Sequence, residues 1–349
     1  MTRLFGIRTL AIAACAALLA LALATTGAGA QIPPVSITLS GANEVPPVTT
    51  TATAKFTASW SGNSLVWSLT GIGTGLTAAH LHVGAAGTNG AVVLPLFAAA
   101  APGSSTINVS GTARAADLTG PLAGKWPEFV AAFVTGGLYA NAHTVTNPGG
   151  EMRAQLPGTA PAAGTTTVAI NLEGRQENPP TTSTGTGTFV GTFSGTTLTY
   201  TLLASGTAIT ASHIHVGAVG TNGGIVVPFF AAAAPGVAAI NQSATVDVSN
   251  LSGSLAGNFA GLLTALRAGQ LYVNVHTVAN AGGDIRGQIP GAAAAPVAAP
   301  SPSVPSLGDA DASGRTSDGY PPLLMALGGA LAVAGAGTAV QLRRVRRRV

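Results

Sequence analysis

The chain alternates hydrophobic and polar residues over short runs that Gly, Pro, Asn and Ser interrupt. The run 36–40 shows this alternation, which indicates a half-buried strand. Runs 56–60 and 65–69 flank the turn sequence 61–64 and predict a hairpin. The segment 43–47 ends in two prolines, so we expect a turn or a sheet edge there. The pattern predicts an all-β protein, with one short helix expected at 128–137.

The second half of the chain repeats the first at a constant offset of 133 residues. Matching positions include Pro46 and Pro179, Glu44 and Glu177, Tyr139 and Tyr272, and Arg153 and Arg286. This period is too long for a solenoid repeat, so the halves are predicted to be tandem domains. We expect domains at 35–156 and 167–289, joined by the linker 157–166.

The first 30 residues have the features of a secretory signal peptide. Arg3 and Arg8 precede the apolar run 9–24, and Ala28-Gly29-Ala30 supplies small residues for cleavage. Cleavage after Ala30 would remove Cys15, the single cysteine of the chain. The mature protein would then have no disulfide, no thiolate metal ligand and no cysteine nucleophile.

The C-terminal region predicts a membrane anchor. Residues 323–342 carry no charge and as a helix would span about 30 Å, the thickness of a bilayer core. The arginine-rich tail 343–349 belongs on the cytoplasmic side. Residues 290–322 are rich in Ala, Pro and Ser and predict an extended, disordered stalk. We therefore expect a secreted protein that a single transmembrane helix anchors at the cell surface. Retention of this helix is expected because no Leu-Pro-x-Thr-Gly sorting motif precedes it.

The formal net charge of +4 arises at the two ends of the chain. Seven of the 15 basic residues lie in the terminal segments, which leaves 8 basic against all 11 acidic residues elsewhere. The body of the protein is therefore slightly acidic, near −3, and no basic patch is expected for nucleic acid.

Histidines provide the main candidate chemistry. The chain has six, in two matching triplets: His80, His82 and His143, and His213, His215 and His276. On a strand, residues i and i+2 point to the same face, so the two histidines of each His-x-His pair project together. The intervening Leu81 or Ile214 is expected to face the core. A third imidazole would complete a three-nitrogen site for Cu, Zn, Ni or Fe, with a position open for water or substrate.

The alternative is a structural role in which the histidines bond to backbone groups and fix the Gly-rich loop 84–90. His-x-His alone is a weak motif, and the 63-residue gap to the third histidine is not a standard metal-ligand spacing. Glu44 and Arg153 recur as Glu177 and Arg286, and their recurrence in a chain with few charges favours a structural pair. Asn89 and its counterpart Asn222 are expected to supply turn geometry.

Three separated blocks resemble the CHRD domain, which is named after chordin. They are Leu39 to Pro47, Ala79 to Gly84, and Leu138 to Gln155, and each has a counterpart in the second repeat. The resemblance implies two immunoglobulin-like β-sandwich or barrel domains and leaves the function largely undefined. It suggests extracellular protein binding, although the cysteine-rich modules of chordin are absent. The His-x-His strand is also similar to part of the copper site of Cu/Zn superoxide dismutase.

We therefore expect a membrane-anchored, non-enzymatic binding or structural protein, with Cu or Zn as candidate metals and an extracellular protein or matrix partner. An extracytoplasmic copper- or zinc-dependent enzyme, such as an oxidoreductase, is the alternative. A purely adhesive pair of domains with structural histidines is a third interpretation. Metal content would distinguish the adhesive interpretation from the first two.

Overall fold

The computed structural model describes residues 29–291. The expected stalk beyond residue 291, the transmembrane helix 323–342 and all but the last two residues of the expected signal peptide lie outside this range. Within the described range, no helix is long and apolar enough to cross a bilayer.

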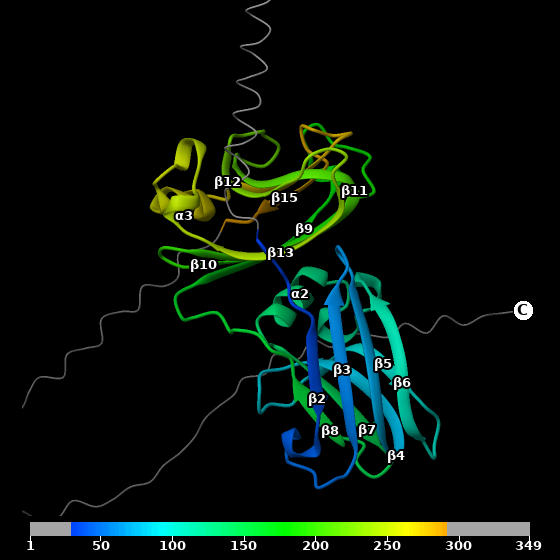
Figure 1. The fold of residues 1–349 in the computed structure, drawn as a ribbon. Helices are drawn as coiled ribbons and strands as arrows, with labels where there is room; N and C mark the ends of the chain where they lie inside the picture. Colours follow the sequence, from blue (N-terminus) through cyan, green and yellow to red (C-terminus); the bar gives the residue numbers. More distant parts are fainter. Residues whose placement is uncertain (1–28, 292–349) are drawn as a thin grey trace, which may run out of the picture. The chain divides into compact units, whose positions relative to one another are not determined.

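Domain 1 is built from seven strands and one α-helix (Figure 1). The strands are β2 (Val35–Leu39), β3 (Thr53–Trp60), β4 (Leu65–Val83), β5 (Ala91–Ala98), β6 (Ser104–Ala113), β7 (Leu138–Thr144) and β8 (Met152–Gln155). The α-helix is α2 (Trp126–Val134), and three 3-10 helices span Gly41–Asn43, Ala115–Asp117 and Gly120–Leu122. The all-β prediction is confirmed, and the helix begins and ends slightly earlier than the expected 128–137.

Strand β4 organises the domain because it belongs to two groups of strands. Its first half pairs with β3 and β6, and its second half pairs with β5 and β7. Strand β8 pairs with β7 and meets the end of β2 through an antiparallel bridge between Ser40 and Arg153. The strand order β2-β3-β4-β7-β8 therefore curves into a sandwich that closes on itself around a core.

A short irregular segment in β4 allows the strand to pass between the two groups. The register of β4 with β6 shifts between Ile72 and Leu76, and its register with β7 shifts between Leu76 and Ala78. Gly75, in this segment, has a φ of +65°. Glycine adopts this left-handed backbone without strain, and a bulge of this kind bends a strand. In domain 2 the same corner places Ala208 at a φ of +56°. Domain 2 therefore keeps the left-handed backbone of this corner although Ala208 replaces the glycine.

Domain 2 repeats this arrangement with strands β9 to β15. The strands are β9 (Thr166–Leu172), β10 (Thr186–Phe193), β11 (Leu198–Val216), β12 (Ile225–Ala231), β13 (Val237–Val246), β14 (Leu271–Thr277) and β15 (Ile285–Ile289). Helix α3 spans Phe259–Arg267, and 3-10 helices span Gly174–Gln176, Val248–Asn250 and Gly253–Leu255. The two-residue strand β1 (Ala30–Gln31) pairs with β13. Strand β11 is the counterpart of β4, with the same length and the same change of partners.

The core of each domain follows from the alternation along its strands. In domain 1, Leu39, Phe56, Leu65, Leu81 and Phe129 are completely buried. Ile214 is likewise completely buried in domain 2, so the expectation that Leu81 and Ile214 face the core is confirmed. The neighbouring residues of β4 and β11 therefore point to the opposite side of the sheet, and these are the histidines.

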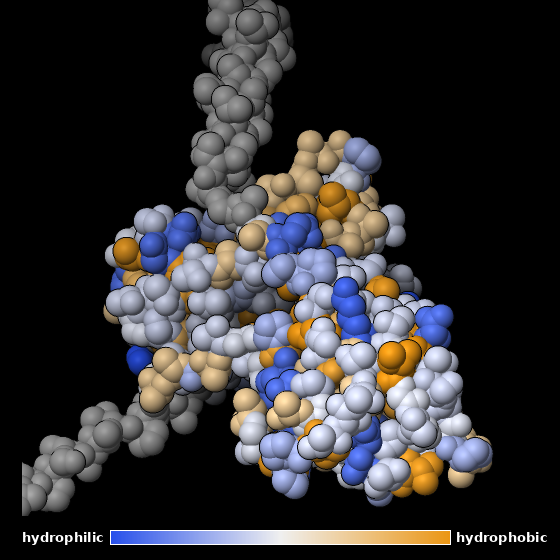
Figure 2. Space-filling model, turned by 60° about the horizontal axis from the view of Figure 1, so that its bottom comes forward, coloured by the Kyte–Doolittle hydropathy of each residue, from blue (hydrophilic) through white to orange (hydrophobic). Residues whose placement is uncertain are grey.

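The surface reflects the low charge of the chain. Figure 2 shows a mostly pale face on which strongly hydrophilic and strongly hydrophobic residues occur in small, separate groups. Single exposed apolar side chains of this kind are normal in soluble domains. Buried polar and charged side chains instead cluster beside the His-x-His strand of each domain.

Candidate metal centre

The register between two neighbouring strands brings the histidines of each triplet together. In domain 1, His80 of β4 lies opposite Asn141 of β7, and His143 is two residues further along β7. His80 and His143 are therefore diagonal neighbours on one face of the sheet, within reach of each other. Domain 2 has the same register between His213 and Asn274.

The three imidazoles of each triplet form a compact group. In domain 1 the ring centres are 5.0 Å apart for His80 and His143, 5.6 Å for His80 and His82, and 5.8 Å for His82 and His143. The corresponding distances in domain 2 are 5.0, 5.5 and 5.7 Å. One nitrogen of each histidine lies within 4.8 Å of a nitrogen of both others. In each domain the structure thus brings together the three histidines that the sequence singled out.

Backbone carbonyls determine which nitrogen two of the histidines present to the site. His82 Nδ1 lies 3.0 Å from Gly90 O, and His143 Nδ1 lies 3.0 Å from Pro148 O. A carbonyl oxygen only accepts hydrogen bonds, so both Nδ1 atoms must donate. In a neutral imidazole the other nitrogen, Nε2, then has a free lone pair. Both Nε2 atoms face the triplet: His82 Nε2 is buried without a hydrogen-bond partner among the described residues, and His143 Nε2 accepts from His80 Nδ1 at 3.1 Å.

Domain 2 repeats the same orientation. His215 Nδ1 lies 3.0 Å from Gly223 O, and His276 Nδ1 lies 3.1 Å from Ala281 O. The inward atoms His213 Nδ1, His215 Nε2 and His276 Nε2 are buried and have no hydrogen-bond partner among the described residues. Buried polar atoms without a partner are costly, so three of them at one point indicate a missing partner.

The environment keeps these imidazoles neutral. Burial is the main cause that lowers the pKa of His80 to about 4, and His143 and His82 lower it further. Burial and the neighbours His276 and His215 lower the pKa of His213 to about 3. Burial also lowers the pKa of His82, His143, His215 and His276. A neutral imidazole is the form that binds a metal ion, so the site is ready for one at neutral pH.

A tyrosine stacks on His82, and an arginine covers the tyrosine ring. The ring of Tyr139 is stacked on His82 with centres 4.8 Å apart and planes 9° apart. The guanidinium carbon of Arg153 lies 3.4 Å from the centre of the Tyr139 ring. His215, Tyr272 and Arg286 form the same stack in domain 2, with distances of 4.9 and 3.4 Å. The stack fixes the plane of the His-x-His ring that it contacts.

The Gly-rich loop 84–90 folds onto this stack. The Gly90 N–H donates to the Tyr139 hydroxyl at 2.9 Å, and a Cβ at Gly90 would lie 1.7 Å from Val83 O. Only glycine fits this close approach of loop and strand. Gln155 donates to the carbonyls of Gly84, Gly136 and Leu138, at 2.8 to 3.0 Å. The structural role considered for the histidines is therefore real for His82, whose Nδ1 holds the loop while Nε2 faces the triplet.

The sequence did not reveal the supporting roles of Tyr139, Arg153 and Gln155. The recurrence of all three at the 133-residue offset, and the two-residue spacing of Arg153 and Gln155 along β8, were the available signals. Asn89 was expected to supply turn geometry; it also donates to Val45 O at 2.8 Å and accepts from Arg153 Nη1 at 3.3 Å. This side chain therefore connects two loops to the buried arginine.

The expected structural pair of Glu44 and Arg153 is not a direct ion pair. Within residues 29–291 the only ion pair joins Arg175 and Glu173. Glu44 is 5% exposed, and burial raises the pKa of its carboxyl to about 7 even though Arg153 acts in the opposite direction. Arg153 instead donates to Asn89 Oδ1, Ala85 O and Gln155 Oε1. These neutral acceptors can stabilise the buried guanidinium of Arg153 because the Tyr139 ring also covers its charge.

Comparison with known proteins places these features in a family. A family model for the CHRD domain matches residues 35–156 and 168–289, which together are more than half of the chain. The chain belongs to the CHRD family. Searches of curated proteins and of solved structures returned no match.

The three CHRD blocks meet at one place in each domain. The first block supplies Glu44 and the turn before β3, the second supplies the His-x-His segment of β4, and the third supplies β7 and β8. His80 of the second block lies opposite Asn141, which lies opposite Arg153 of the third. The residues that carry the CHRD resemblance therefore surround the histidine triplet.

Proposed function

We propose that the protein is a non-enzymatic CHRD module of the cell surface and that each domain binds one transition-metal ion through its three histidines. One observation carries the metal proposal. In both domains two histidines donate their Nδ1 hydrogens to backbone carbonyls, so their Nε2 lone pairs meet the Nδ1 atom of the third. Histidine ligands in metal sites are held in this way by an outer hydrogen bond.

The distances between the nitrogens suit such a site. Nitrogens that bind one tetrahedral zinc ion at about 2.0 to 2.1 Å lie about 3.3 Å from each other. The two nitrogens of His80 and His143 lie 3.1 Å apart, and the whole triplet lies within 4.8 Å. Small rotations of the imidazole rings would bring all three nitrogens to the spacing of about 3.3 Å. Three neutral nitrogens suit Cu or Zn, and Cu binds more tightly to a given set of nitrogen ligands.

Metal content of the full-length protein tests this proposal. We expect close to two equivalents of Cu or Zn after loading and removal of excess metal, measured by elemental analysis. Replacement of His80, His82 and His143 by Ala should lower the value to one equivalent, and the same change at His213, His215 and His276 should do likewise. No stoichiometric metal in the wild-type protein would refute the proposal.

A matched pair of variants separates metal binding from loop fixation. In His82→Asn, the side-chain amide can still donate to Gly90 O, but no atom replaces Nε2. We expect this variant to retain its thermal stability in the absence of metal and to lose one equivalent of metal. His82→Ala should lose both thermal stability and one equivalent of metal. If the two variants bind metal equally well and melt equally early, His82 serves the loop alone.

The cellular part of the proposal rests on the sequence. The apolar segment 323–342 and the arginines after it favour a retained membrane anchor, and the signal features of residues 1–30 favour export. An extracellular protein or matrix component is the proposed partner. Full-length protein should sediment with membranes and be accessible to external protease, whereas a chain that ends at residue 290 should be released. Equal release of both chains would refute the anchor.

A further inference from the structure

Two strands of domain 1 separate next to the bridge that closes the sandwich. Ser40 and Arg153 exchange two backbone hydrogen bonds of 3.1 Å each. The next pair in the same antiparallel register is Thr38 of β2 and Gln155 of β8, but the two strands are not paired there. These residues instead line a pocket of about 390 Å³, together with Asn43, Arg153, Ala86 and Gly87. The pocket thus occupies the place of the missing rung.

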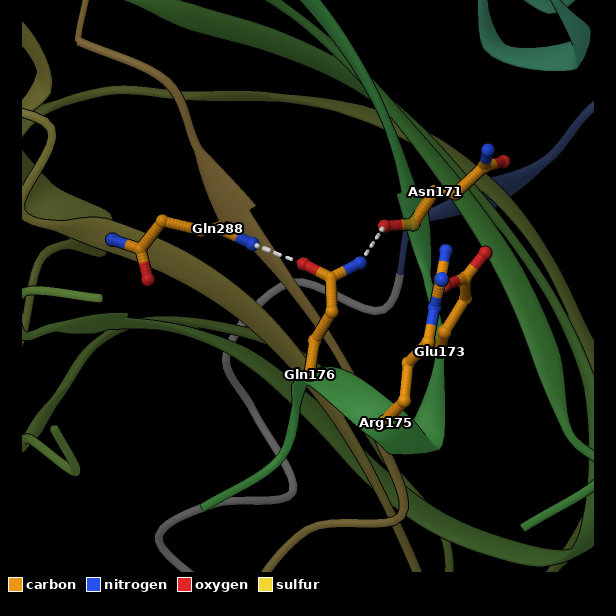
Figure 3. A network of polar contacts seen from close by, with 5 residues as sticks. All are labelled: Asn171, Glu173, Arg175, Gln176 and Gln288. Atoms are coloured by element: carbon orange, nitrogen blue, oxygen red, sulfur yellow. Dashed lines mark hydrogen bonds and ion pairs between the residues drawn. The ribbon is translucent and has the colours of Figure 1, made fainter. Parts of the chain in front are cut away.

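Domain 2 shows which group fits into such a gap. Asn171 and Gln288 are the counterparts of Thr38 and Gln155, and the side-chain amide of Gln176 lies between them (Figure 3). Its Nε2 donates to Asn171 O at 3.3 Å, and its Oε1 accepts from the Gln288 N–H at 3.4 Å. One primary carboxamide therefore replaces the missing rung between β9 and β15.

Two sequence differences leave the gap of domain 1 open. Asn43 stands where domain 2 has Gln176, and its shorter side chain donates to Arg153 O at 3.2 Å instead. Ala154 stands where domain 2 has Gly287, at which a Cβ would lie 2.5 Å from Asn171 O. A Cβ at this position therefore requires the two strands to be further apart. Domain 1 has both this Cβ, on Ala154, and the shorter side chain, on Asn43.

We propose that the pocket of domain 1 binds a primary carboxamide, supplied by a glutamine side chain of a partner polypeptide. The carbonyl of Thr38 would accept from its NH₂ group, and the Gln155 N–H would donate to its oxygen, as in domain 2. A carboxylate fits less well because it would face the Thr38 carbonyl with no hydrogen to donate. Arg153 does not favour an anion here, because its N–H groups already donate to Asn89, Ala85 and Gln155. This proposal does not depend on metal binding.

Ligand-observed NMR with the full-length protein provides the test. The probe is the tripeptide Gly-Gln-Gly with acetyl and N-methylamide ends, compared with the same peptide carrying Glu or Ala in the middle. We expect the Gln peptide to bind at least about tenfold more tightly than the Glu or Ala peptide. The Glu side chain cannot donate to the Thr38 carbonyl, and the Ala side chain can form neither hydrogen bond. Acetamide that binds more weakly than the Gln peptide would assign the site to a polypeptide. Acetamide that binds equally well would assign it to small amides and overturn the proposal of a polypeptide partner.

Two variants of one residue show whether the gap itself is the site. Asn43→Gln should place an amide in the gap, as Gln176 does in domain 2, and abolish peptide binding. Asn43→Ala removes the same side chain without filling the gap, so it should retain binding. Peptide binding that survives in Asn43→Gln, or equal affinity for the Gln, Glu and Ala peptides, would overturn the proposal.

A gain of binding in domain 2 completes the design. In the Asn43→Gln background, Gln176→Asn together with Gly287→Ala recreates the two residues that keep the gap of domain 1 open. We expect this triple variant to bind the glutamine peptide again. Circular dichroism and thermal unfolding would show that each variant remains folded. A folded triple variant that does not bind would contradict the assignment of the gap as the site.

Discussion

Replacement of the buried glutamates by glutamine gives the sharpest test of the electrostatics beside the histidine triplets. Glu44 and Glu177 are 5% and 7% exposed, and burial raises the pKa of each carboxyl to about 7. In domain 2, Asn274 Nδ2 donates to Glu177 Oε2 at 3.4 Å, while Oε1 is buried without a partner among the described residues. Glutamine keeps an acceptor for Asn274 and cannot ionise.

The sign follows from proton linkage. A carboxyl with a raised pKa holds its proton in the folded state between its ordinary pKa and about 7, where the unfolded chain has lost it. Its contribution to stability is therefore complete below pH 4.5 and disappears as the pH rises through 7. A pKa raised from 4.5 to about 7 corresponds to about 3 kcal/mol at 1.36 kcal/mol per pH unit. Screening by solvent reduces this to about 1 to 2 kcal/mol for each glutamate.

Denaturant unfolding of metal-free protein between pH 5 and pH 9 measures this effect. We expect the stability of Glu44→Gln relative to wild type to increase by about 1 to 2 kcal/mol over this range, and Glu177→Gln to behave alike. The histidine contributions cancel in this difference because both proteins contain them. Glu128→Gln, on the exposed face of α2, is the control and should show no such trend. Parallel stability curves for wild type and Glu44→Gln would refute the argument that this carboxyl is buried and protonated.

Two further predictions concern the histidine sites. Tyr272→Phe removes the hydroxyl that accepts from the Gly223 N–H at 3.0 Å, so we expect a loss of about 1 to 3 kcal/mol in the free energy of unfolding and an unchanged metal content, because the ring still stacks on His215. Unchanged stability would show that the loop does not depend on this bond. Because burial lowers the pKa of His80 to about 4, protons should displace its metal only near that pH, whereas metal-free protein should lose stability as the pH falls from 6.5 towards 4. Metal release near pH 6.5, followed by elemental analysis after dialysis, would contradict the burial of the site.

The sequence by itself determined the tandem repeat, the β class and the histidine triplets. Period-2 alternation fixes which side of β4 faces the core, so Leu81 and the two histidines around it had to lie on opposite faces. A constant offset of 133 residues required the same fold twice. These are local or periodic properties, and a linear sequence carries them completely.

The tertiary structure alone decided what surrounds the histidines. The register of β4 against β7 places His143 beside His80, and no local pattern specifies a register between strands 63 residues apart. The stack of His82, Tyr139 and Arg153 depends on three strands that meet only after folding. The expected pair of Glu44 and Arg153 was wrong as a direct ion pair. The recurrence of two residues in both repeats indicates that they share an environment, but it does not determine the distance between them.

The difference between the two domains was also decided in three dimensions. Asn43 and Ala154 are unremarkable substitutions for Gln176 and Gly287 in the aligned repeats. Their effect appears only where β2 and β8 separate, because one methylene decides whether an amide reaches across and one Cβ decides how closely the strands approach. Side-chain length and backbone spacing act together at this point, and only the folded chain brings them together.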